Sequence, residues 1–138
     1  KHLMQMKCFI FLITLVGAIA PLGAIANSNI YQCEVVSDLY IKQDGALDLM
    51  QNSPRIGQRF TVIKKTGEII GDVMDSLNKP RVIVSGADKN SYKLIWQQKS
   101  SASNGVYIDY LSIDGSVSAS KKPFGFFSGS LLMSGWCE

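Results

Sequence analysis

Short runs in which apolar and polar residues alternate recur along most of the chain, and a period of two is typical of β-strands. Turn-forming residues such as glycine, asparagine and proline separate the runs at intervals of about 8 to 12 residues, as in antiparallel barrels and sandwiches. No stretch of ten residues shows a convincing amphipathic helix pattern, although one helical turn fits residues 46–50 or 72–77. The runs cover residues 31–41, 59–64, 68–73, 81–85, 92–98, 106–113, 124–127 and 131–137.

This pattern predicts an all-β chain with a single antiparallel β-barrel or sandwich of about eight short strands. The chain shows no internal repeat and no linker, which indicates one domain. A cysteine pair near the two ends, discussed below, favours the barrel over the sandwich. A break in the first run is expected at Ser37 and Asp38, where two polar residues interrupt it.

The aromatic residues of two runs are candidates for a ligand site. Tyr92 and Trp96 share one face of their strand, whereas Tyr107 and Tyr110 lie on opposite faces of theirs, because successive side chains point to opposite sides. Such residues either line a cavity for an apolar ligand or a sugar, or pack in the core of a small β protein. We predict a small-ligand site from these four residues and keep core packing as the alternative.

The segment Phe124-Gly125-Phe126-Phe127 places large aromatic side chains at adjacent positions of one strand. Phe126 and Phe127 cannot both face one core, since neighbours in a strand point to opposite faces. Either a loop covers the second face, or one ring is exposed as a contact surface. We name Phe124, Phe126 and Phe127 as a candidate surface for a protein partner.

The first 26 residues differ in character from the rest and resemble a secretory signal peptide. Lys7 precedes an apolar run over 9–19, and Ala24-Ile25-Ala26 supplies the small residues that signal peptidase reads. We predict cleavage between Ala26 and Asn27, which leaves residues 27–138 as an exported domain in the bacterial periplasm or outside the cell. Retention of the segment as a membrane anchor is the alternative; no later stretch is apolar enough to span a membrane.

Export would place the remaining cysteines in an oxidising compartment, where disulfides form. Once Cys8 is removed with the signal segment, Cys33 and Cys137 allow one intramolecular pairing, and two thiols in an oxidising compartment are expected to pair. Such a bridge would restrict the unfolded chain strongly and hold the first strand beside the last. A redox-active pair is the weaker alternative, because the two cysteines lie far apart in sequence and form no C-x-x-C motif.

Charge and composition exclude several function classes for residues 27–138. Twelve Lys/Arg against eleven Asp/Glu leave a net charge of +1, which provides no field to attract nucleic acid. The only histidine is His2, so residues 27–138 have no histidine-based triad and no histidine metal site. Two cysteines are too few for a Cys₄ zinc site. We expect no metal, no cofactor and no catalysis. A hydrolase using a pair such as Asp72 and Asp75, or Asp109 and Asp114, stays a minor alternative.

Several short motifs resemble those of a group of small exported bacterial proteins of unknown function. The resemblance extends over most of residues 30–137 and implies export, a bacterial source and a single β domain, but no activity and no site residues. Its motifs are Phe60-x-Val62, Thr66-Gly67-x-Ile69-x-Gly71, Lys122-Pro123-Phe124 and Ser134-Gly135-Trp136-Cys137.

Together these observations predict a non-catalytic exported β-barrel protein that binds a small ligand. The alternative is a protein-interaction module of the cell envelope, acting as a complex subunit or as an inhibitor of an enzyme. Both readings rest on a β domain with exposed or cavity-lining aromatic residues and without a catalytic set.

Overall fold

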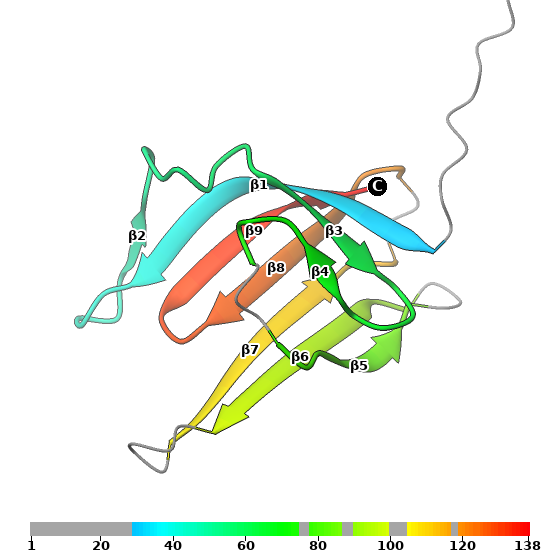
Figure 1. Cartoon of the computed structure of the whole chain (residues 1–138). Coiled ribbons are helices and arrows are strands. Elements are labelled where there is room, and N and C mark those ends of the chain that lie inside the picture. Colours follow the sequence, from blue (N-terminus) through cyan, green and yellow to red (C-terminus); the bar gives the residue numbers. More distant parts are fainter. Residues whose placement is uncertain (1–28, 75–77, 87–89, 100–104, 117–118) are drawn as a thin grey trace, which may run out of the picture.

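The computed structural model describes residues 29–74, 78–86, 90–99, 105–116 and 119–138. These residues form nine β-strands with no helix among them, and all strand pairs are antiparallel (Figure 1). The all-β prediction is therefore confirmed. The strands are β1 (Ile30–Ile41), β2 (Leu47–Leu49), β3 (Arg59–Ile63), β4 (Ile69–Ile70), β5 (Arg81–Ser85), β6 (Tyr92–Lys99), β7 (Val106–Ile113), β8 (Lys122–Ser128) and β9 (Leu131–Cys137).

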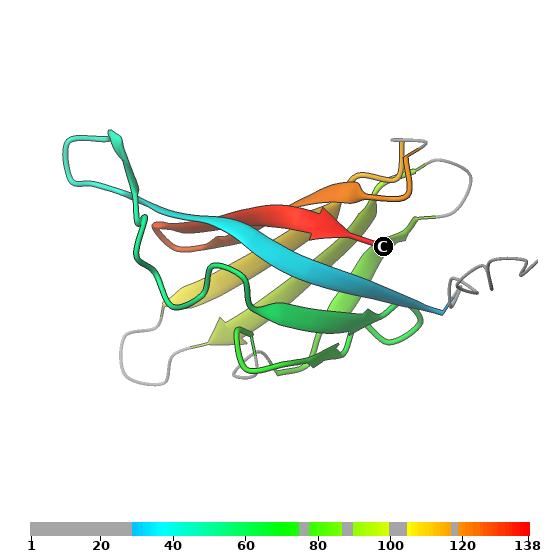
Figure 2. The ribbon, with the colours of Figure 1, turned by 90° about the horizontal axis from the view of Figure 1, so that it is seen from above.

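The strands make one sheet in the order β4-β3-β1-β9-β8-β7-β6-β5, with β2 added beside β1. The sheet curls into a half-barrel, so that β3 and β4 lie opposite β8 and β9 when the molecule is seen from above (Figure 2). This single curled sheet corresponds to the barrel alternative and not to a two-layer sandwich. In the described residues no ladder joins the two ends of the order, β4 and β5.

Side-chain packing brings these two ends together. The turn at Gly67, between β3 and β4, lies against Leu94 and Val82 of the opposite end of the sheet. The Tyr92 hydroxyl donates a hydrogen bond of 2.9 Å to the backbone carbonyl of Lys64. The barrel is thus closed by contacts of side chains rather than by a strand ladder.

The core fills the concave face of the sheet. Along the central part of the long strands, alternate residues are buried there, as a period of two requires. Burial of this apolar surface is the main stabilising contribution to the fold. The buried hydrophobic residues are Tyr31, Cys33, Val35, Phe60, Val62, Met74, Tyr92, Leu94, Trp96, Leu111, Ile113, Phe124, Phe126, Met133 and Cys137.

Cys33 and Cys137 form the predicted disulfide, with an S–S distance of 2.00 Å. They are direct partners in the β1–β9 ladder, and their Cα atoms are 4.0 Å apart. The next pair, Gln32 and Glu138, exchanges both backbone hydrogen bonds. The cysteines therefore occupy a non-hydrogen-bonded pair, where strands approach each other most closely. The bridge fixes the pairing of the two strands in the middle of the sheet order.

The structure differs from the sequence-based predictions in three local elements. The predicted strand 68–73 is reduced to Ile69–Ile70, because Gly71 has a φ of 139° and turns the chain away. Residues 46–50, which allowed a helical turn, instead supply β2, paired with the end of β1. β1 continues from Ile30 to Ile41 without the break expected at Ser37 and Asp38, and a β-bulge lies between Val35 and Ser37 instead. The predicted signal segment, residues 1–26, lies outside the described residues, and its cleavage stays a prediction.

Candidate binding surfaces

The structure does not bring the four candidate ligand-binding residues together. Tyr92 and Trp96 are buried in the core, with Trp96 only 1% exposed. Tyr107 lies on the same concave face at the far end of β7 and is 61% exposed. Tyr110 is half-buried on the opposite, convex face. A site that uses all four side chains at once is not formed by this geometry.

The candidate partner surface also divides between the two faces. Phe124 and Phe126 are core residues, with ring centroids 5.3 Å from Phe60 and 6.2 Å from Trp96, respectively. Phe127 points to the convex face and is 45% exposed, its ring 6.4 Å from that of Tyr110. Of the three, only Phe127 presents its ring to solvent.

Phe127 belongs to a row of apolar side chains that crosses the convex face in register. Residues directly opposite each other in a ladder share a face. Leu49 pairs with Leu39, and Leu39 pairs with Leu132. Leu132 pairs in turn with Phe127, and Phe127 with Tyr110. The row therefore runs across β2, β1, β9, β8 and β7 without a charged member.

Further apolar residues extend this row along three strands. Ile41 and Leu47 form the next pair on the same face of the β1–β2 hairpin, and Ile108 and Val106 continue along β7. We call the combined surface the convex patch. All of its side chains are uncharged, and six of them are among the exposed large hydrophobic residues: Ile41, Leu47, Leu49, Val106, Ile108 and Phe127. Its complete membership is Leu39, Ile41, Leu47, Leu49, Val106, Ile108, Tyr110, Phe127 and Leu132.

The concave face carries several hydrophilic residues behind the same part of the sheet. A second row lies one residue along each strand and therefore faces the other way. Its members are Asp48, Tyr40, Leu131, Ser128, Asp109 and Trp96, which are consecutive partners from β2 to β6. At this end the concave row combines hydrophilic residues with Leu131 and Trp96, whereas the convex face carries exposed apolar residues. Tyr40 donates a hydrogen bond to Asp48, which raises the pKa of the Tyr40 hydroxyl.

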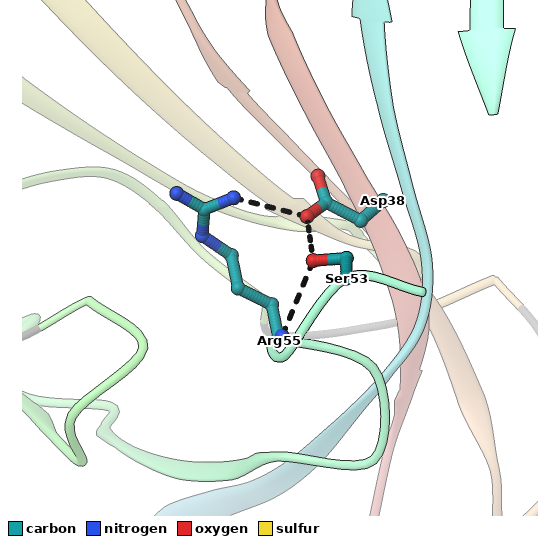
Figure 3. Close-up of polar contacts among 3 residues, drawn as sticks. All are labelled: Asp38, Ser53 and Arg55. Carbon is teal, nitrogen blue, oxygen red and sulfur yellow. Dashed lines mark hydrogen bonds and ion pairs between the residues drawn. The ribbon is translucent and has the colours of Figure 1, made fainter. Parts of the chain in front are cut away.

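A buried carboxylate lies at the boundary between the core and this polar row. Asp38 of β1 is fully buried and accepts hydrogen bonds through Oδ2 from the Ser53 hydroxyl and from Arg55 Nη1, the latter at 3.0 Å (Figure 3). The Arg55 backbone N–H donates to Ser53 Oγ at 3.2 Å. These contacts hold the loop between β2 and β3 against β1.

Two buried polar atoms on the concave face have no hydrogen-bond partner among the residues that the structure describes. One is Asp38 Oδ1, which is turned away from Ser53 and Arg55 in Figure 3. The other is the indole Nε1 of Trp96, on β6. Buried polar groups in proteins are nearly always paired, so unpaired ones need an explanation such as water, an ion or a ligand.

A shallow cavity of ≈ 80 Å³ lies beside the disulfide and is lined by Gln32, Cys33, Glu34, Arg59, Trp136 and Glu138. It contains a Glu34–Arg59 ion pair of 3.0 Å, but the arginine side chain is 78% exposed. An exposed pair of this kind contributes little to stability. Nearby, Lys121 Nζ lies 3.7 Å from the centroid of the Trp136 ring.

The part of the chain that the structure describes contains no group of three or more His, Cys, Asp or Glu side chains placed to hold a metal ion. It also contains no helix long and apolar enough to cross a membrane. No protein-family model, no curated protein and no solved structure matches the chain. The resemblance to small exported bacterial proteins therefore stays a prediction.

Sequence reasoning found Phe127 and Tyr110 but missed most of the convex patch and the Asp38 cluster. The sequence of the β1–β2 hairpin does contain a feature that points to the convex patch: the apolar residues Leu47 and Leu49 are separated by the single polar residue Asp48. Alternation shows that these leucines share a face, but not that the face is exposed. Asp38, with Ser37, interrupts an otherwise apolar strand segment, and a carboxylate in such a segment is expected to be paired where it is buried.

Proposed function

We propose that this chain is a non-catalytic interaction module of the cell envelope that binds another protein through the convex patch. The observation that carries the proposal is the uncharged row from Leu49 to Tyr110, which five adjacent strands present in register. Contiguous exposed apolar surface is costly in a monomer and marks interaction sites. A core of leucine, isoleucine and aromatic side chains is typical of the buried centre of an interface.

The charges beside the convex patch indicate what kind of partner fits. Tyr110 is followed in the row by Ile95 of β6 and then by Arg81 of β5. Lys93 lies on the same convex face of β6, two residues from Ile95. The acids Asp48 and Asp109 point to the other face of the sheet. A partner surface with an apolar centre and carboxylates at one side is therefore complementary.

The projecting β1–β2 hairpin adds to this surface. It extends away from the body of the half-barrel (Figure 1), and all three residues of β2 are exposed. Its convex side carries two apolar pairs, Leu39 with Leu49 and Ile41 with Leu47. A partner that packs on the convex patch would also cover this side of the hairpin and remove its apolar surface from water.

The test uses neighbouring residues of β7 that point to opposite faces. A photoreactive amino acid at Ile108, in the convex patch, should cross-link a partner in intact cells, whereas the same group at Tyr107 should not. The identified partner, once purified, should bind the wild-type chain and lose at least tenfold in affinity for Ile108→Ser, while Tyr107→Ser keeps wild-type affinity. Equal cross-linking from both positions, or equal affinity of all three proteins, contradicts the proposal.

A second copy of the chain is the competing occupant of the convex patch. Sedimentation of the purified protein distinguishes the two cases. A monomer at micromolar concentration agrees with a different protein as partner. A dimer that Ile108→Ser converts to monomer would assign the patch to self-association and overturn the proposal. Of the four residues named for the small-ligand function predicted from the sequence, three lie on the other face of the sheet: Tyr92, Trp96 and Tyr107.

A further inference from the structure

We infer that the free edge of β2 takes up an extended strand of the partner protein, and that this strand has an apolar–basic–apolar sequence. The inference rests on the proposed function and deepens it, because β2 contributes Leu47 and Leu49 to the convex patch. The three residues of β2 pair with β1 on one side only, and all three are exposed. An unpaired strand edge is a template for the backbone of another chain.

The hydrogen bonds that flank β2 show which of its backbone groups point outward. Met50 N–H, just after the strand, donates to a β1 carbonyl at 2.9 Å. The Ala46 carbonyl, just before the strand, accepts a hydrogen bond of 2.9 Å from the residue that follows β1. Hydrogen-bonded and non-hydrogen-bonded pairs alternate in an antiparallel ladder. Asp48, midway between the two, therefore directs its backbone groups to β1, whereas Leu47 and Leu49 direct theirs away from it.

Three of these outward groups have no hydrogen-bond partner among the residues that the structure describes. They are Leu47 N–H, Leu47 C=O and Leu49 N–H, whereas the Leu49 C=O accepts a hydrogen bond of 3.1 Å from Gln51 N–H. An added antiparallel strand satisfies all three, because one of its residues exchanges two hydrogen bonds with Leu47 and another accepts from Leu49. The longer strand β5, at one end of the sheet order, is less suited. A β-bulge between Val82 and Val84 interrupts its register, and bulges at an edge hinder strand addition.

The side chains of β2 define the sequence that the added strand would carry. Leu47 and Leu49 are 59% and 50% exposed on the convex face, so apolar residues opposite them would continue the convex patch. Asp48 points to the other face, where its carboxylate accepts a hydrogen bond from Tyr40 and keeps lone pairs for a further donor. A lysine or arginine opposite Asp48 is therefore complementary.

The same aspartate disfavours a second copy of the chain as the occupant of this edge. Two copies of β2 in a two-fold antiparallel register, with Leu47 opposite Leu49, would place their Asp48 carboxylates directly opposite each other. Like charges at such positions are destabilising. A different protein, with a basic residue at this position, avoids the repulsion.

NMR of the ¹⁵N-labelled chain tests the inference with two synthetic nonapeptides, in which a central Val-Lys-Val or Val-Glu-Val is flanked on each side by three threonines. At millimolar concentration the lysine peptide should shift the amide resonances of Leu47 and Leu49 in a saturable manner. The glutamate peptide should bind roughly tenfold more weakly or less, because it places like charges opposite each other. Leu47→Pro removes an outward N–H that the β1 ladder does not use, and it should abolish the Leu49 shift. Leu47→Ala, which keeps that N–H, is the matched control and should retain it.

Several results would overturn the inference. They include unchanged amides with the lysine peptide, equal binding of the two peptides, and binding that Leu47→Pro preserves. Shifts of both amides that depend on the concentration of the chain without peptide would assign the edge to self-association. Ile108→Ser, which tests the convex patch, should leave peptide binding unchanged, and a loss of binding in this variant would place the peptide on the patch instead. Strand addition and the proposed function can therefore fail separately.

Discussion

Gly135 of β9 lies so close to the backbone carbonyl of Glu34 on β1 that no side chain fits between the two strands. A Cβ at this position would overlap the Glu34 oxygen and would stand 2.7 Å from the Phe124 ring. The contact is beside the β-bulge at Val35, which bends β1 toward its partner. The glycine thus allows the central ladder to approach to the distance that the disulfide bridges.

We expect Gly135→Ala to destabilise the fold by about 3 kcal/mol or more, because the obstructing atoms belong to backbone and to a packed ring. Gly125, on the adjacent strand β8, is the matched control, since a Cβ there would meet only Phe127 at 3.7 Å. Gly125→Ala should change the free energy of unfolding by about 1 kcal/mol or less. Chemical denaturation of both variants checks this, and similar values for the two would contradict it.

Removal of the disulfide should lower stability through the unfolded chain. Cys33 and Cys137 are 104 positions apart, so the double variant Cys33→Ser/Cys137→Ser should lose about 4 to 5 kcal/mol by the loop-entropy relation. Denaturant unfolding of the wild type with and without reductant gives an independent measurement of the same quantity. Unchanged midpoints under both treatments would show that the bridge does not constrain the chain.

Tyr92 should make the fold sensitive to alkaline pH. Burial, and then the nearby Tyr31, raise the pKa of the Tyr92 hydroxyl from 10.0 to about 12. Since the folded-state pKa lies above the unfolded one, the neutral hydroxyl stabilises the protein fully below pH 10, and this contribution is lost as the pH rises toward 12. Stability measured from pH 8 to 12 should fall above pH 10 in the wild type and less steeply in Tyr92→Phe. A parallel decline in both proteins would exclude Tyr92 as the cause.

Arg55 should contribute far more to the stability of the fold than Arg59, although each forms an ion pair of 3.0 Å. Arg55→Ala leaves the buried Asp38 carboxylate with fewer hydrogen bonds, and we expect a loss of about 2 kcal/mol. Arg59→Ala breaks an exposed pair with Glu34 and should cost about 0.5 kcal/mol or less. Thermal or urea unfolding of the two variants compares them. Equal losses would mean that burial of Asp38 does not decide the difference.

The strands were predictable because each depends on local alternation and local turn residues. Val106–Ile113 and Arg81–Ser85 have the bounds expected from sequence, and Tyr92, Leu94 and Trp96 share the buried face as their spacing indicates. The prediction was less accurate where the backbone conformation of a single residue decides where a strand ends, as Gly71 does for β4. The sequence also left residues 46–50 undecided between a helical turn and a strand, and their pairing with β1 makes them a strand.

The sequence by itself determined the all-β class, the pairing of the only two cysteines after residue 26, and which side chains of a strand share a face. Tertiary structure alone decided which face is covered, because burial depends on strand order and on the curl of the sheet. Leu39, Phe127 and Tyr110 are far apart in the chain, and the register of β1, β9, β8 and β7 places them in one row. The same register leaves Tyr107 and Ile108, adjacent in sequence, exposed on opposite faces.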